Sequence, residues 1–130
     1  MKLKKIQKLL QAEVFWGEEF LERIEVVTVC GADLMSDVLA FFKEKTLLLT
    51  GLTNAQVIRT AEMIDLSGIV FVRGKRPGND LIEMAKERSL PLLMTTLPLY
   101  ETCGILYTAG LEGCSGKRLQ QVKRAEQVDP

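Results

Sequence analysis

Residues 46–54 read Thr-Leu-Leu-Leu-Thr-Gly-Leu-Thr-Asn, an apolar run followed by a turn of small and polar residues. A stretch with apolar residues three and four positions apart follows at 55–64. A continuous apolar run that gives way to helical spacing is typical of a β-strand followed by an α-helix. Thr53 and Gln56 have the spacing of a capping box, which marks the start of the helix. The stretch therefore predicts one βα unit.

The same unit recurs on both sides of this stretch. Apolar runs near 25–30, 68–73 and 91–95 each precede a turn and an amphipathic segment, and strand starts near 46, 68 and 91 recur about every 22 residues. Successive βα units in one domain form a largely parallel sheet with helices packed on its faces. We therefore expect a three-layer α/β domain with a mainly parallel sheet.

The two ends of the chain differ from this pattern. Leu3, Ile6, Leu9 and Leu10 have helical spacing and predict an amphipathic helix over 3–12, and 14–16 can form an edge strand. After Gly110 the chain becomes polar. We expect a domain over 1–111 and a polar C-terminal tail over 112–130 that is a frayed helix or disordered.

Composition excludes several function classes. The 130 residues contain 17 basic and 17 acidic side chains, a balance that argues against a dedicated binder of nucleic acid or of a membrane. The N-terminal stretch is not expected to be a signal peptide, and no apolar run approaches the roughly 18–20 residues that a membrane span needs. Three cysteines without a CxxC pair favour a reducing cytoplasm.

The chain has no histidine, which removes the commonest general base near neutral pH and the commonest zinc ligand. Two segments, 68–76 and 110–118, have glycines and a Gly-Lys pair that invite comparison with a P-loop. Both carry one residue too many before that pair, and both place arginine where the motif needs serine or threonine. We therefore predict a protein that is not an enzyme and has no metal or cofactor.

A candidate binding site lies where the predicted strands end. The carboxyl ends of parallel strands meet at one edge of a sheet, where ligands bind in open α/β folds. The residues that we expect there as ligand-binding groups are Asp33, Ser36, Asp37, Thr50, Gly51, Thr53, Asn54, Arg59, Arg73, Gly74, Lys75, Thr95 and Thr96.

Each part of this candidate site has a structural interpretation and a functional one. In the structural interpretation Asp33 caps the helix that follows it and the acidic charges complement the helix dipole; in the functional one Asp33 or Asp37 bonds a ribose hydroxyl or a cation. The turn 50–54 is either a tight connection or a nest for a small anion, and Arg59 faces either solvent or the sheet edge. The cations at 73–76 either line a solvated loop or recognise phosphate, whose oxygens match a guanidinium fork.

The cysteines are not assigned a role. Cys30 and Cys103 are expected in the core and Cys114 in the accessible tail.

Three blocks of the chain resemble the DRTGG domain family. They are 31–41, then 48–54 together with 58–61, then 69–75, and they occur in the family's order over about residues 1–111. The resemblance implies a fold like that of the N-terminal domain of HPr kinase/phosphorylase, without that enzyme's P-loop catalytic domain. Similar domains stand beside CBS domains in regulatory pyrophosphatases and in phosphotransacetylase-like proteins.

These observations lead to three hypotheses for function. The first is a non-catalytic regulatory module that binds a small anionic ligand, possibly a nucleotide, at the strand ends. The second is a protein-interaction or dimerisation adaptor that binds a protein partner and no ligand, and the third is an enzyme that uses Asp33 or Asp37. Aromatic residues at 15, 16 and 20 also predict a homodimer, since an apolar patch is commonly buried by two-fold pairing.

Overall fold

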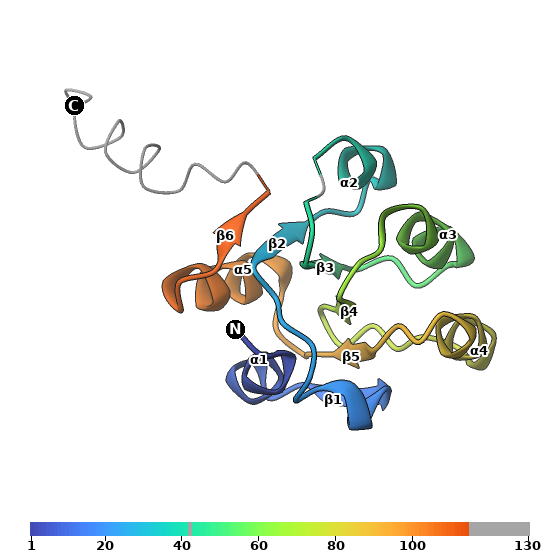
Figure 1. Ribbon diagram of the computed structural model, residues 1–130, viewed down its shortest axis with the longest axis horizontal. Coiled ribbons are helices and arrows are strands. Elements are labelled where there is room, and N and C mark those ends of the chain that lie inside the picture. Colours follow the sequence, from blue (N-terminus) through green and yellow to red (C-terminus); the bar gives the residue numbers. More distant parts are fainter. Residues whose placement is uncertain (42, 115–130) are drawn as a thin grey trace.

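One sheet of six strands organises the protein in the computed structural model, which describes residues 1–41 and 43–114 (Figure 1). The strands in chain order are β1 (Glu13–Trp16), β2 (Thr28–Gly31), β3 (Thr46–Thr50), β4 (Gly68–Phe71), β5 (Leu92–Met94) and β6 (Glu112–Gly113). Their order across the sheet is β1-β5-β4-β3-β2-β6. The pairs from β5 to β6 are parallel, and β1 pairs with β5 in the antiparallel direction. The prediction of a mainly parallel sheet is confirmed.

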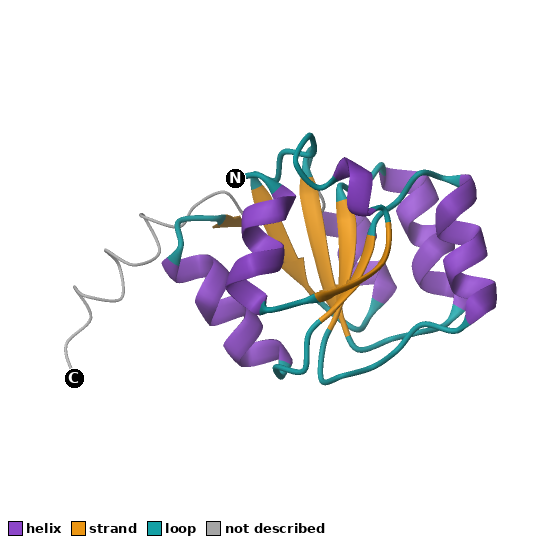
Figure 2. Cartoon of the chain, turned by 90° about the horizontal axis from the view of Figure 1, so that it is seen from below, coloured by secondary structure: helices purple, strands orange, loops and turns teal. Residues whose placement is uncertain are grey.

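Helices cover both faces of the sheet, as Figures 1 and 2 show. The helices are α1 (Leu3–Leu10), α2 (Met35–Phe41), α3 (Ala55–Ile64), α4 (Asn79–Glu87) and α5 (Leu99–Thr108), with a short 3-10 turn, η1 (Glu18–Phe20). Strands β2 to β5 lie side by side in chain order, so right-handed crossovers place α2, α3 and α4 on one face. Helix α5 crosses the opposite face beside α1 and brings β6 next to β2. No helix in the described part of the chain is long and apolar enough to cross a membrane.

Alternating strand side chains divide the core into two layers. In β3, Leu48 packs with α2, α3 and α4, whereas Leu47 and Leu49 pack with α1 and α5. All five residues of β3 are buried. A central parallel strand covered on both faces is expected to be apolar throughout, which explains why 46–50 is an unbroken apolar run capped by threonines.

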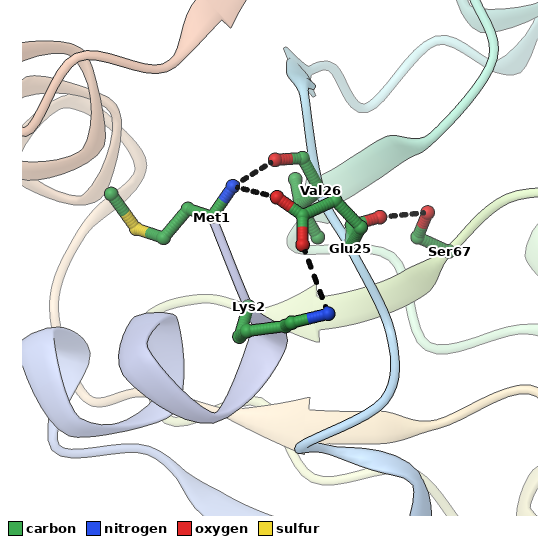
Figure 3. A network of polar contacts seen from close by, with 5 residues as sticks. All are labelled: Met1, Lys2, Glu25, Val26 and Ser67. Atoms are coloured by element: carbon green, nitrogen blue, oxygen red, sulfur yellow. Dashed lines mark hydrogen bonds and ion pairs between the residues drawn. The ribbon is translucent and has the colours of Figure 1, made fainter.

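Strand β2 begins later than the sequence predicts. Residues 25–27 do not enter the central sheet, because Glu25 and Val26 pair with the N-terminal residues (Figure 3). The Met1 amino group donates to Glu25 Oε1 at 2.7 Å and to the Val26 carbonyl at 2.8 Å. Lys2 Nζ lies 3.2 Å from Glu25 Oε2, and Ser67 Oγ donates to the Glu25 carbonyl at 3.3 Å. This network joins the N-terminal residues to the segments that precede β2 and β4, at the end of the sheet where the parallel strands begin.

Helix α3 is capped one residue later than the capping-box spacing indicates. Asn54 is the N-cap residue, and its side-chain oxygen accepts a hydrogen bond from the Gln56 amide at 3.1 Å. Asparagine at this position satisfies an otherwise unpaired amide of the first helical turn. The helix itself lies where the sequence predicts it.

The last strand is an addition to the predicted sheet. Glu112 and Gly113, the first residues of the predicted tail, pair with Thr28 and Val29 of β2. Residues from 115 onward lie outside the described residues, so the prediction of a frayed or disordered tail and the domain boundary at 111 stay predictions.

Candidate functional site

The turns that follow β2 to β5 meet at the carboxyl edge of the sheet. The strand register aligns their ends, since Gly31 pairs with Leu49, and Phe71 pairs with both Thr50 and Met94. The candidate residues from these turns are therefore neighbours in space. They differ in whether their side chains already have hydrogen-bond or ion-pair partners within the protein.

Asp33 joins the first turn to the second. Its Oδ1 accepts hydrogen bonds from the Gly51 amide at 2.8 Å and from Thr50 Oγ1 at 3.0 Å. Thr50 Oγ1 also accepts from the Leu52 amide at 3.2 Å. Asp33 thus ties the β2–α2 turn to the β3–α3 turn instead of capping α2, the helix that follows it. The buried Thr50 hydroxyl is used within the protein.

Arg73 reaches the same place from the third turn. A Cβ atom on Gly51 would lie 2.6 Å from Arg73 Nη2, so the guanidinium rests directly against the Gly51 backbone. Within the described part of the chain no carboxylate pairs with this exposed guanidinium. We call Asp33, Gly51 and Arg73 the strand-end corner.

The turn that carries Arg73 is tight. Arg73 has φ +57° and Gly74 has φ +67°, and the Lys75 amide donates to the Val72 carbonyl at 3.1 Å. Two consecutive residues at positive φ inside such a turn are the signature of type I′ geometry. A left-handed conformation costs free energy at arginine, and such outliers concentrate at functional sites. The Gly-Lys pair therefore sits in a tight turn and not in a phosphate-cradling loop.

The third and fourth turns are closed against each other. The Arg73 amide donates to the Leu97 carbonyl at 2.8 Å, and the Gly74 amide donates to the Thr95 carbonyl at 2.9 Å. The buried Thr95 hydroxyl donates to the Leu10 carbonyl at 3.0 Å and accepts from the Leu97 amide at 3.3 Å. These contacts hold the backbone of Arg73 in place. They also occupy Thr95, which the sequence placed among the ligand groups.

The other exposed candidates form no hydrogen bond or ion pair with the corner residues within the described part of the chain. They are Ser36, Asp37, Thr53, Asn54, Arg59, Lys75 and Thr96. Arg76, the neighbour of Lys75, turns away: it forms a two-point contact with Glu13 at 3.2 and 3.3 Å and lies over the Phe15 ring. The cationic loop thus contributes Arg73 and Lys75, and not Arg76, to the surface near the corner.

The chemistry of the corner suits an anion. A guanidinium presents its donors in a planar fork that matches phosphate oxygens, and Arg73 has no described carboxylate partner. Lys75 lies exposed on the same turn, and the exposed amino end of α3 begins three residues beyond Gly51 at Asn54. Helix amino termini and cations both favour negative charge. Asp33 shapes this surface by fixing the Gly51 backbone.

All three cysteines of the chain lie around β2. Cys30 is buried on β2, and burial together with a hydrogen bond involving Cys114 raises its pKa to about 12. Burial also raises the pKa of Cys103 on α5. Cys114 is half-buried, and its Sγ donates to the Val29 carbonyl at 3.5 Å, so it is less exposed than a residue in a free tail would be. Contact with the core explains the difference, since β6 carries Cys114 to the sheet.

A groove of about 880 Å³, which was not predicted from the sequence, lies between α5 and the β2–β6 edge of the sheet. Its lining includes Val29, Tyr100, Gly104, Tyr107 and Gly113. The sequence does contain a signal for this groove. Helix α5 carries apolar or small side chains on more sides than the one that meets the sheet.

Comparisons with known proteins agree with this fold. The DRTGG domain family matches residues 5–109 of the chain. A comparison with curated protein sequences finds no match. Among solved structures, the crystal structure of the CBS and DRTGG domains of the regulatory region of Clostridium perfringens pyrophosphatase, complexed with the activator diadenosine tetraphosphate, superposes with a TM-score of 0.63 at 20% sequence identity. That match covers 80% of this chain and 45% of the pyrophosphatase chain, so this protein spans less than half of its structural neighbour.

Proposed function

Because the chain belongs to the DRTGG domain family, we propose that it is a regulatory module without catalytic activity, which binds a small anionic ligand, a nucleotide, at the strand-end corner. The structural neighbour supports the choice of ligand class, since that regulatory region is complexed with a dinucleoside polyphosphate activator. The proposal assigns the corner to the phosphate groups of the ligand.

The observation that carries this proposal is the position of the Arg73 guanidinium. It lies against Gly51, where a side chain would displace it, and its backbone is held at positive φ by hydrogen bonds to the β5–α5 turn. An exposed cation that is positioned in this way, with no ion pair to a described carboxylate, is pre-organised for an anion. Pre-organisation lowers the ordering cost of binding.

The remaining candidates have subordinate roles in this proposal. Gly74 and Lys75 extend the cationic surface, and Thr53 and Asn54 border it at the start of α3. Further out, Ser36, Asp37, Arg59 and Thr96 are assigned to contacts with the remainder of the ligand. Thr50 and Thr95 support the backbone from beneath.

A thermal-shift experiment tests the proposal. The full chain is heated alone and with inorganic phosphate, AMP, ATP or diadenosine tetraphosphate, because a ligand specific for the folded state raises Tm. We expect at least one of the nucleotides to raise Tm, and Arg73→Ala to abolish the increase. Arg88→Ala is the matched control: it also removes an arginine charge, from the end of α4, where Arg88 pairs with Glu62 at 2.9 Å.

The outcomes separate the alternatives. No shift with any of the four compounds would exclude the nucleotide module and favour the protein-interaction adaptor. Equal shifts in Arg73→Ala and in the unmodified chain would place the ligand elsewhere. An enzyme that uses Asp33 or Asp37 would require a turnover that Asp33→Asn or Asp37→Asn abolishes.

The proposal includes a homodimer in a reducing cytoplasm. Strand β1 forms one edge of the sheet and carries the half-buried Trp16, whose ring centroid lies 5.4 Å from that of Phe20. An edge strand offers unpaired backbone groups to a second copy, which supports pairing at this edge. The three cysteines are free thiols, as a reducing compartment would keep them.

A further inference from the structure

The groove beside α5 is not used by the proposed nucleotide site. Its volume is about 880 Å³. One wall is α5 and the other is the β2–β6 edge of the sheet. Residues 100, 104 and 107 share one side of α5, because positions three and four apart are neighbours on a helix.

This side of α5 is apolar and open. The side chain of Tyr100 is 85% exposed and that of Tyr107 is 38% exposed. Gly104 lies between them, and a Cβ there would meet nothing within 4 Å. Contiguous apolar surface of this kind marks an interaction site in a water-soluble fold. Two carboxylates, Glu101 and Glu112, border it.

We propose that this groove is occupied by the C-terminal segment of the same chain, residues 115–130. The segment leaves the sheet at the groove itself, since Gly113 lines the groove and Cys114 is held to the Val29 carbonyl at 3.5 Å. A tethered segment is present at a high effective concentration, and so modest contacts suffice to dock it.

The sequence of the segment complements the groove. Leu119 and Val122 are three residues apart in the sequence, a spacing that would place them on one side of a helical turn. Four basic residues surround them, Lys117, Arg118, Lys123 and Arg124, against two acidic ones, Glu126 and Asp129. Aliphatic side chains fit the apolar wall, and the excess of positive charge faces the two border carboxylates.

The segment is long enough to follow the groove. Helix α5 has 10 residues and is about 15 Å long. The 16 residues of 115–130 would reach about 24 Å even in a helical conformation, and further when extended. The inference is independent of nucleotide binding at the strand-end corner, which lies on other turns.

The two tyrosines of the chain provide the test, because both line the groove. Protein labelled with ¹³C on the tyrosine rings and on leucine and valine methyl groups is studied by NMR. We expect nuclear Overhauser effects between the Tyr100 or Tyr107 ring and the methyl groups of Leu119 or Val122. These effects should be independent of protein concentration.

Two matched variants complete the experiment. Leu119→Asn with Val122→Asn removes the two aliphatic side chains without changing the charge of the segment, and should shift the tyrosine ring signals and increase their solvent exposure. Gln120→Asn with Gln121→Asn makes the same number of uncharged changes between those positions and should leave the tyrosine signals unchanged. Absence of the Overhauser effects in the unmodified chain would overturn the proposal, whatever the variants do. Effects that appear only at high concentration, and between differently labelled molecules, would overturn it in favour of a second copy in the groove.

Discussion

At the scale of single residues, the account depends on how glycine and arginine share the strand-end corner. Gly51 was predicted as part of a glycine turn, and Arg73 as a cation at a strand end. Their contact could not be predicted, because it depends on the type I′ turn that aims Arg73 back over β3. The two roles considered for Asp33 also missed its actual partners, Gly51 and Thr50, which come from the neighbouring unit.

Gly51→Ala should weaken nucleotide binding more than it weakens the fold. The added Cβ would lie 2.6 Å from Arg73 Nη2, and the flexible guanidinium can move away, so we expect a loss of less than about 1 kcal/mol in the free energy of unfolding. Displacing one charged hydrogen-bond donor should raise the Kd by about tenfold or more. Urea denaturation and calorimetry measure the two effects; normal affinity in this variant would show that the guanidinium position is unimportant.

Asp33→Ala should lower the free energy of unfolding by about 1–2 kcal/mol, because it removes an acceptor used by Gly51 and Thr50. Asp33→Asn keeps a side-chain carbonyl oxygen at the same position and should cost less. Urea denaturation of both variants checks the order. If Asp33→Ala and Asp33→Asn lose the same free energy of unfolding, the negative charge of Asp33 stabilises the turns, and the position of its acceptor oxygen does not.

Gly17→Ala should destabilise the fold more than Gly110→Ala. Both glycines have positive φ, +93° and +106°, and therefore share a backbone cost. Only Gly17 is crowded, since a Cβ there would lie 3.0 Å from the Pro91 Cα, whereas Gly110 faces open space. We expect a difference of about 1 kcal/mol or more in urea denaturation; the reverse order would contradict this packing.

At the scale of elements, the helices and central strands follow from the apolar pattern, and the exceptions lie at the ends of β2. The strand was predicted over 25–30 from its β-branched residues, but it spans Thr28–Gly31. Propensity cannot reveal that Glu25 and Val26 are engaged by Met1 and Lys2, which are more than 20 residues away in the chain. Strand β6 escaped prediction for a similar reason, since two residues carry no periodicity.

The Glu25 network makes the fold sensitive to acid. Hydrogen bonds from the Met1 amino group and from Lys2 lower the pKa of Glu25 below its usual 4.5. The stabilisation is present above the unfolded-state pKa and is lost as the pH falls through the folded-state pKa. We expect the free energy of unfolding of the unmodified chain to fall more steeply than that of Glu25→Gln between about pH 5 and 3.

Urea denaturation across this pH range measures the difference. The matched control is Glu22→Gln, which alters an exposed carboxylate on the same segment. Its pH profile should parallel that of the unmodified chain. If the pH profile of Glu25→Gln is also parallel to that of the unmodified chain, the Glu25 network does not contribute to the pH dependence of stability.

At the scale of the whole molecule, the layered architecture was predictable and the arrangement at its edges was not. Four βα units imply a parallel sheet with its ligand edge at the strand ends, and the structure has both helical layers that this implies. The return of α5 across the opposite face depends on contacts between distant segments. The groove is a product of that return. The sequence shows that α5 is apolar on more than one side, but it does not show that the β2–β6 edge forms the opposite wall.

The homodimer is tested by light scattering at micromolar concentration. We expect a mass twice the 14.6 kDa of one chain. Trp16→Glu should restore the single-chain mass while circular dichroism stays unchanged, because the side chain is only half-buried. A mass of 14.6 kDa for the unmodified chain would refute the dimer.

An NMR titration of the ¹⁵N-labelled full chain with ATP tests most directly whether an anionic nucleotide binds at the strand-end corner. We expect saturable shifts centred on the amides of Gly51, Arg73 and Gly74, and the loss of these shifts in Arg73→Ala. No saturable shift up to roughly 1 mM ATP, a Kd that corresponds to only about 4 kcal/mol of binding free energy, would contradict nucleotide binding at this corner. Shifts confined to the groove beside α5 would contradict it equally.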